Sequence, residues 1–254
     1  MTTTARPRAR AAELARRQAA GREARRRRLV MWTGALVVVG LLAAIAVAVA
    51  SASRGDGTAV ATGEVTAPAH ATADGVVGVG RDDAPVTVSV FFDYLCPFCG
   101  RFEAANGAEL ERLVDSGRAR VELHPLAFLD AQSDGTSYSS RTANALATVA
   151  DGAPDRVLAF HQGLFRQQPE EGTRGLTDQQ IADIARDADV PDAVVDRFGD
   201  RTFVPWIADV TERAFASGIS GTPTVLVDGS AFTSGDLYTA GPLTEAVEAA
   251  AAAR

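Results

Sequence analysis

The sequence predicts an α/β fold with a long helical insertion, preceded by one membrane-spanning helix. Three observations lead to this prediction. Apolar and polar residues alternate from 86 to 90 and two phenylalanines follow, strand signals disappear between about 137 and 217, and no charged residue occurs in 29–50. Alternation at period two indicates a strand, whereas apolar spacings of three and four residues indicate helices.

The only two cysteines of the 254-residue chain follow this predicted strand, in the sequence Cys96-Pro97-Phe98-Cys99. Pro97 fits the first position of a helix, where a missing N–H leaves no partner unsatisfied, and an apolar stripe at helical spacing follows it. Cys96 is therefore expected at a helix N-terminus. Unpaired backbone N–H groups and the helix dipole stabilise a thiolate there, and the thiolate is the reactive form of cysteine.

Charge is distributed unevenly along the chain. The first 28 residues carry ten arginines and two glutamates, a net charge of +8, whereas the whole chain is at −7. Residues 29–50 are long enough, at about 1.5 Å per residue, to cross a hydrocarbon core of about 30 Å as one helix. The positive-inside rule then keeps residues 1–28 in the cytoplasm and places residues 51–254 outside it. Because topology explains the arginines, no nucleic-acid partner is expected.

A cleaved signal peptide is the alternative to a membrane anchor. Small-x-small sites occur at Ala48-Val-Ala50 and Ala50-Ser-Ala52. The apolar run exceeds the 7 to 15 residues or so that are typical of a signal peptide, which favours the anchor. Both interpretations place the folded part of the chain outside the cytoplasm.

The remaining chain divides into a tether and a domain. Residues 51–74 are rich in Ala, Gly, Thr and Ser, a composition typical of a flexible linker. The folded domain is predicted over 75–254, with a strand–helix–strand unit and a parallel strand pair at its start. Strands are predicted at 76–79, 86–92, 118–124, 224–227 and 230–232, the last two joined by the hairpin turn Asp228-Gly229.

Helices fill the segment 137–217 and end the chain. Thr177-Asp-Gln-Gln180 has the pattern of a capping box. Helices are predicted from near Cys96 to Gly117, over 137–149, 154–166 and 177–187, over a short segment ending at Gly199, over 203–214, and from Pro242 onward.

Neither a metal nor another cofactor is expected. Two cysteines cannot complete a four-ligand zinc site, and His70, His124 and His161 lack the short spacing that would do so. His124 and His161 are predicted to be structural or surface residues. A merely structural Cys96–Cys99 disulfide stays open as an alternative, although so short a loop gives little chain-entropy stabilisation.

Two motifs carry a resemblance to a known family. Phe91-Phe-Asp-Tyr-Leu-Cys-Pro-Phe-Cys-Gly100, the helical insertion, and Gly221-Thr-Pro-Thr-Val-Leu-Val-Asp-Gly229 together resemble the membrane-anchored, DsbA-like branch of the thioredoxin superfamily. The resemblance covers about residues 75–254 and implies a thioredoxin-like fold. It also implies that Pro223 lies beside the cysteines after a cis peptide bond, and that Thr222 offers its backbone to an extended substrate.

The chain departs from that family at one position. Many members have a buried acidic residue six positions before the first cysteine, where this sequence has Val90. Asp93 or water is left to accept the proton of the buried thiol.

The resemblance implies an extracytoplasmic thiol:disulfide oxidoreductase that forms disulfides in exported proteins. Cys96 is expected as the exposed nucleophile or attacked sulfur, and Cys99 as the buried resolving thiol. Pro97 and Phe98 are expected to tune the redox pair, with Phe98 at the rim contacting apolar substrates. By family analogy, a DsbB-like or VKOR-like membrane protein re-oxidises the enzyme, which is expected to act as a monomer.

Two other functions remain open. The first is a reductase or isomerase of exported proteins, although 51–74 is too short and polar for the dimerisation domain that isomerases of this superfamily usually carry. The second is a tethered, non-catalytic module that binds unfolded chains.

Overall fold

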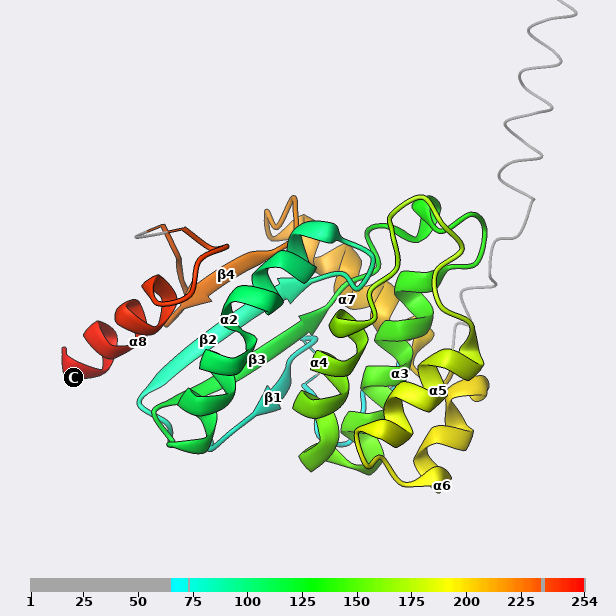
Figure 1. Cartoon of the computed structure of the whole chain (residues 1–254), viewed down its shortest axis with the longest axis horizontal. Coiled ribbons are helices and arrows are strands. Elements are labelled where there is room, and N and C mark those ends of the chain that lie inside the picture. Colours follow the sequence, from blue (N-terminus) through cyan, green and yellow to red (C-terminus); the bar gives the residue numbers. More distant parts are fainter. Residues whose placement is uncertain (1–64, 73, 234–235, 254) are drawn as a thin grey trace, which may run out of the picture. The chain divides into compact units, whose positions relative to one another are not determined.

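The computed structural model describes residues 65–72, 74–233 and 236–253 (Figure 1). The predicted basic segment 1–28 and the predicted membrane span 29–50 lie outside these residues. Within the described ranges, no helix has the length and apolar character needed to cross a membrane.

The described end of the predicted tether packs onto the domain. The backbone N–H of Ala69 donates to Asp151 Oδ1 at 2.8 Å, and Ala71 forms an isolated antiparallel bridge with Val77. The folded unit therefore begins before the predicted boundary at Gly75. The composition of this segment predicted a linker. Its small side chains, however, also allow it to lie close against another surface.

A five-stranded sheet forms the centre of the domain, in the order β1-β3-β2-β4-β5. β2 and β3 are parallel, which confirms the predicted pair, and the other neighbours are antiparallel. The strands are β1 (Val77–Val79), β2 (Val86–Phe92), β3 (Ala119–Pro125), β4 (Thr224–Val227) and β5 (Ser230–Ala231).

The predicted hairpin between β4 and β5 is present. Asp228 and Gly229 have φ values of 48° and 77°, as a two-residue turn between twisted strands requires. β5 ends at Ala231, one residue before the predicted end. The hairpin matters for the site because it sets the position of the loop that precedes β4.

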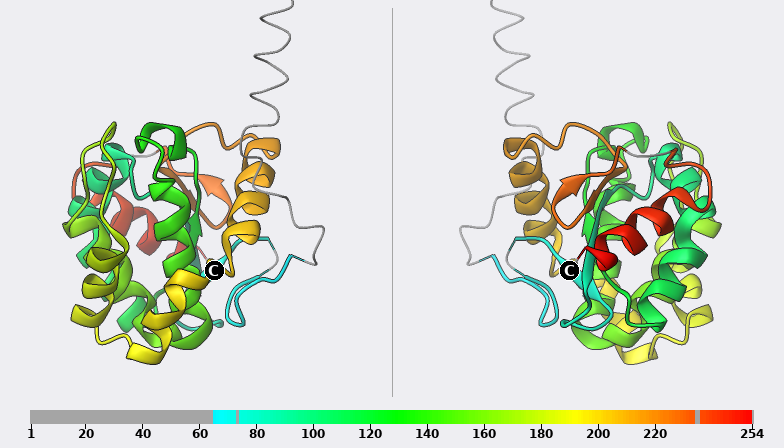
Figure 2. Two further views of the ribbon diagram at one scale, coloured as in Figure 1. Left: turned by 90° about the vertical axis from the view of Figure 1, so that its right-hand side faces the viewer. Right: turned by 90° about the vertical axis from the view of Figure 1, so that its left-hand side faces the viewer.

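Some helices cover the two faces of the sheet, and others form a group at its side. Figure 1 shows α3 to α6 gathered at one side of the strands, and Figure 2 shows α7 on the face opposite α2 and α8. The capping box predicted at Thr177 and Gln180 opens α5. The helices are α2 (Pro97–Asp115), α3 (Tyr138–Gly152), α4 (Val157–Arg166), α5 (Asp178–Asp187), α6 (Asp192–Val195), α7 (Val204–Ala216) and α8 (Pro242–Ala252), with short 3-10 turns η1 (Asp130–Gln132), η2 (Pro154–Arg156) and η3 (Asp196–Asp200).

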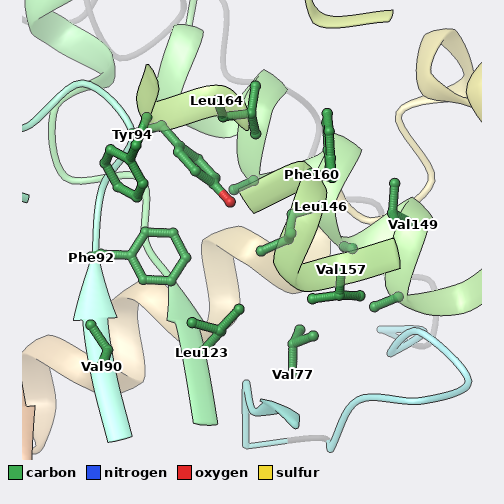
Figure 3. Close-up of a cluster of buried hydrophobic side chains, with 14 of the residues drawn as sticks. Val77, Val90, Phe92, Tyr94, Leu123, Leu146, Val149, Val157, Phe160 and Leu164 are labelled. Carbon is green, nitrogen blue, oxygen red and sulfur yellow. The ribbon is translucent and has the colours of Figure 1, made fainter. Parts of the chain in front are cut away.

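The sheet and the helical insertion share one hydrophobic core. Figure 3 shows Phe92 of β2 and Leu123 of β3 in the same cluster as Leu146 of α3 and Phe160 of α4. All four are 1% exposed or less, and burying such a side chain contributes about 1.5 to 3 kcal/mol. The C-terminal end of β2, from which the cysteine motif follows, is thus held by the insertion as well as by the sheet.

Candidate active site

The cysteine motif lies where β2 passes into α2. Four residues separate the strand from the helix, and the last of them, Cys96, is the N-cap of α2 with extended backbone angles. Pro97 occupies the first helical position, as its fixed φ and missing N–H favour. The predicted position of Cys96 at a helix N-terminus is confirmed.

Cys96 is more buried as a residue than the sequence predicted. The residue is 6% exposed, and its sulfur lies 3.3 Å from the carbonyl oxygen of Thr222, to which it donates when it is protonated. The expected exposure of Cys96 therefore does not match its burial, and its role as nucleophile stays a prediction. The loop before β4 lies against the sulfur, a long-range contact that the spacing of the cysteines does not reveal.

Hydrogen bonds to the Cys96 sulfur favour its thiolate. A hydrogen bond from the Cys99 thiol lowers the pKa most, and burial of Cys96 opposes the shift. Hydrogen bonds from the Thr222 side chain and from the backbone N–H groups of Cys99 and Phe98 lower the pKa further. Together they lower the pKa of Cys96 from 9.0 to about 6. A thiol with this pKa is largely ionised at neutral pH and is a good leaving group.

Cys99 has the opposite character. It is 1% exposed, one turn further into α2, and its sulfur is free, as is that of Cys96. Burial, then the hydrogen bond to the Cys96 sulfur and repulsion from its charge, raise the pKa of Cys99 well above 9.0. The two sulfurs therefore differ in protonation at neutral pH, with a thiolate at Cys96 and a thiol at Cys99.

Thr222 and Pro223 reach the cysteines from a distant part of the chain. They precede β4, which pairs with β2, and this pairing brings the Thr222 carbonyl to the Cys96 sulfur across 126 positions of sequence. The peptide bond between Thr222 and Pro223 is cis. Both residues are half-buried, so part of this loop faces solvent beside the redox pair.

The buried carboxylate of Asp93 accepts hydrogen bonds from the loops around it. It is 0% exposed and accepts hydrogen bonds from the N–H groups of Leu95 and Leu129, at 2.8 and 2.9 Å, and from the Ser139 hydroxyl at 2.7 Å. Burial raises the pKa of Asp93 to about 6 although these bonds oppose the shift. The carboxylate thus ties the β2–α2 loop to the β3–η1 loop and α3.

The two residues between the cysteines lie at the surface. Pro97 is exposed, and Phe98 is 49% exposed, one of few large apolar side chains in the described chain that face solvent. The position of Phe98 at the rim matches the prediction, and its role toward substrates stays a prediction.

Gln168 belongs to the site and was missed by sequence reasoning. Its side-chain N–H group donates to the carbonyl oxygens of Cys96 at 2.8 Å and Tyr94 at 3.0 Å. Gly100 admits this side chain, because a Cβ there would lie 2.1 Å from Gln168 Oε1. Gln168 follows α4 in a polar loop, and nothing in its local pattern distinguishes it from its neighbour Gln167.

His124 and His161 lie in largely buried surroundings. His161 is 3% exposed and its Nδ1 lies 3.0 Å from the Tyr94 hydroxyl, while Nε2 lies 3.4 Å from Glu103 Oε2. Burial lowers the pKa of His124 to about 4. These environments fit the structural roles predicted for both residues. In the described part of the chain, no three His, Cys, Asp or Glu side chains are grouped to hold a metal.

The fold of the chain is similar to the folds of known proteins. DsbA from Mycobacterium tuberculosis, in its reduced form, is 27% identical with a TM-score of 0.57, and covers 70% of this chain and 98% of its own. MdbA, a thiol-disulfide oxidoreductase from Actinomyces oris, is 26% identical with a TM-score of 0.64, and covers 76% of this chain and 93% of its own. The fold and these relatives define the class, a thioredoxin-fold domain of the DsbA-type thiol–disulfide oxidoreductases.

A thioredoxin family model matches residues 72–247, and the chain belongs to that family. Among curated relatives, the serine/threonine-protein kinase PknE of Mycobacterium tuberculosis is 34% identical over 117 residues, 44% of this chain. The match spans only 20% of the kinase's length.

Proposed function

We propose that the protein oxidises cysteine pairs in exported polypeptides outside the cytoplasm, with Cys96 and Cys99 as its redox pair. The observation that carries the proposal is the opposed pKa shifts of two sulfurs one helical turn apart. A stabilised thiolate at Cys96 stabilises the reduced enzyme, and a stable reduced form favours giving the disulfide away.

The proposed reaction transfers one disulfide and two electrons. A substrate thiolate attacks the Cys96 sulfur of the oxidised enzyme, which breaks the Cys96–Cys99 bond and forms a mixed disulfide, and Cys99 takes up a proton. A second substrate thiolate then attacks the substrate sulfur and expels Cys96 as a thiolate. The substrate dithiol becomes a disulfide, and the enzyme disulfide becomes a dithiol.

The loop before β4 would hold the substrate during this exchange. The Thr222 backbone lies beside the Cys96 sulfur and is available to pair with an extended chain, and Pro223 keeps the loop from donating an N–H of its own. Pro97 and Phe98 would tune the pair from the first turn of α2. These roles are supported by the position of the four residues beside Cys96.

The cellular setting rests on the sequence before the described domain. Ten arginines before an uncharged stretch at 29–50 support a single-pass anchor with the catalytic domain outside the cytoplasm. An oxidase must itself be re-oxidised, and the resemblance assigns this step to a DsbB-like or VKOR-like membrane protein. Exported cysteine-containing proteins are the proposed substrates.

Redox titration of the full-length protein against glutathione tests the direction of the reaction. The expected potential lies nearer to about −120 mV, the value for DsbA, than to about −270 mV, the value for thioredoxin. A potential near the second value would indicate a reductase. A disulfide that exchanges with no thiol would indicate a binding module without turnover.

A further inference from the structure

Two exposed aromatic rings and an arginine cluster beside the redox pair. Phe98 lies between the cysteines, and Tyr238 belongs to the segment before α8; their ring centroids are 6.2 Å apart. The guanidinium carbon of Arg101 lies 4.5 Å from the centroid of each ring. All three side chains are exposed, so they form one surface cluster between the first turns of α2 and the segment before α8.

The segment that carries Tyr238 is fixed to α2. Asn106, 0% exposed, donates to the Leu237 carbonyl oxygen at 2.8 Å. Glu109 Oε2 accepts from the Gly241 N–H at 3.0 Å. A ring held on anchored backbone loses little conformational entropy when a partner binds, so exposed rings of this kind are effective contact points.

Arg101 has no carboxylate partner among the described residues. Arg112, in the last turn of α2, and Arg118, after its end, have carboxylates within 4.0 Å, whereas Arg101 forms no ion pair with any described residue. The two rings lie on adjacent sides of the guanidinium and not on its opposite faces, because their centroids are only 6.2 Å apart while each lies 4.5 Å from the guanidinium carbon. Contact with both rings orients the guanidinium, and the N–H groups on its remaining sides can bond a carboxylate.

We infer that Phe98, Arg101 and Tyr238 form a specificity site that selects substrate segments with a carboxylate side chain close to the reactive cysteine. The inference rests on the proposed oxidation of polypeptide thiols and names the substrate class. Arg101 is five residues along α2 from Cys96, about 7.5 Å of helix rise, and an extended chain covers that distance in two or three residues. The occupant is therefore an extended polypeptide with Asp or Glu about two to four residues from its cysteine.

The test compares dithiol peptides that differ only in Glu, Gln or Lys three residues from the first cysteine. With oxidised full-length protein at low salt, kcat/KM for peptide oxidation should be about fivefold higher for Glu than for Gln, lower still for Lys, and the preference should shrink as salt is added. Arg101→Gln should reduce the Glu to Gln ratio to about one, and Arg101→Lys should keep part of it because the charge remains without the stacked plane.

Three controls separate this role from others. Arg118→Gln, an exposed arginine after α2, should leave the ratio unchanged. Tyr238→Ala should raise KM for all three peptides. The Cys96 pKa, followed by the absorbance of the thiolate, should stay the same in Arg101→Gln. A changed Cys96 pKa with equal slowing of every peptide would overturn the inference, because Arg101 would then act on the sulfur.

Binding measured without turnover distinguishes failure of this inference from failure of the proposed function. Peptides with serine in place of both cysteines, followed by fluorescence anisotropy, should bind more tightly with Glu than with Gln to the wild-type protein and equally to Arg101→Gln. Equal binding of Glu and Gln peptides to the wild type would overturn the inference even if all peptides are oxidised. Absence of oxidation together with a clear Glu preference would reject the oxidase and leave the specificity site standing.

Discussion

At Cys96, the fold couples thiolate formation to stability. The pKa of this thiol is 9.0 in a model thiol and about 6 in the folded chain. Between these values the folded state has released a proton that the unfolded state retains, so the free energy of unfolding rises with pH. The stabilisation is complete above the unfolded pKa and is lost as the pH falls through about 6.

Urea unfolding of the reduced protein between pH 6 and pH 9 measures this effect. The wild type should become more stable relative to Cys96→Ser as the pH rises over that range. The oxidised wild type, which has no thiolate, provides the control and should lack the trend. A constant difference between wild type and variant would contradict a lowered Cys96 pKa.

Asp93 gives a pH dependence of opposite sign. Its pKa is raised by burial from 3.8 to about 6, so the folded state holds a proton that the unfolded state has lost at intermediate pH. Stability from this residue therefore falls as the pH rises from about 4 to about 6.

Asp93→Asn tests the interpretation of that carboxylate as a loop anchor. An amide has one acceptor oxygen in place of two, so a donor among Leu95, Leu129 and Ser139 loses its partner at a cost of about 1 to 3 kcal/mol. Urea unfolding of the oxidised protein should show this loss and no Asp93 titration. A variant that is as stable as the wild type but slow in thiol exchange would instead assign Asp93 to proton transfer.

Single residues of the site differ in how well the sequence predicts them. Cys96 and Pro97 follow local rules, because a proline after an N-cap fits the start of a helix. The contact between Cys96 and Thr222 spans 126 positions, and only the resemblance to a family suggested it. The predicted exposure of Cys96 differs from its burial in the structure, because that burial depends on the same contact.

Among the elements, the loop after α4 links the helical insertion to the start of α2. Gln168→Ala removes two hydrogen bonds to the carbonyl groups of Tyr94 and Cys96, a loss of about 0.5 to 1.5 kcal/mol each. Amide hydrogen exchange in residues 94–99 should become faster in this variant. Gln167→Ala, at an exposed neighbouring position, should leave the exchange unchanged; equal protection in the two variants would remove Gln168 from the site.

The periodicity of the sequence predicted the strands and helices better than it predicted the contacts between them. The strands of the sheet and the helices of the insertion each have a local apolar pattern, and the turn Asp228-Gly229 needs only positive φ values. Composition gave the wrong boundary near Gly75, because alanine-rich sequence is compatible with both a linker and a closely packed segment. Gln168 has no local signal, since its role depends on how the insertion folds back.

For the whole molecule, the proposed function depends on which side of a membrane the domain occupies. A reporter that is active only outside the cytoplasm, fused after Arg254, should be active, because ten arginines precede the uncharged stretch at 29–50. A reporter that is active only inside provides the matched control and should be silent. Activity of the second fusion alone would contradict the orientation and remove the oxidising compartment that the proposal needs.

The shared core explains why one site can combine residues from distant parts of the described domain. Phe92 and Leu146 pack in one cluster, so the strand before the cysteines and the insertion that supplies Gln168 hold each other in place. The loop at Thr222 arrives through the pairing of β4 with β2. No single segment contains the site, which is why motifs identified its sulfurs but not all of its neighbours.

The different roles proposed for the two sulfurs are tested most directly by trapping substrates as mixed disulfides. Cys99→Ser should accumulate covalent complexes with other proteins on a non-reducing gel, because a mixed disulfide at Cys96 has lost its resolving thiol. Cys96→Ser should trap little, since the remaining sulfur at Cys99 is 1% exposed and its pKa is raised. Equal trapping by both variants, or trapping by neither, would contradict the proposed roles of Cys96 and Cys99.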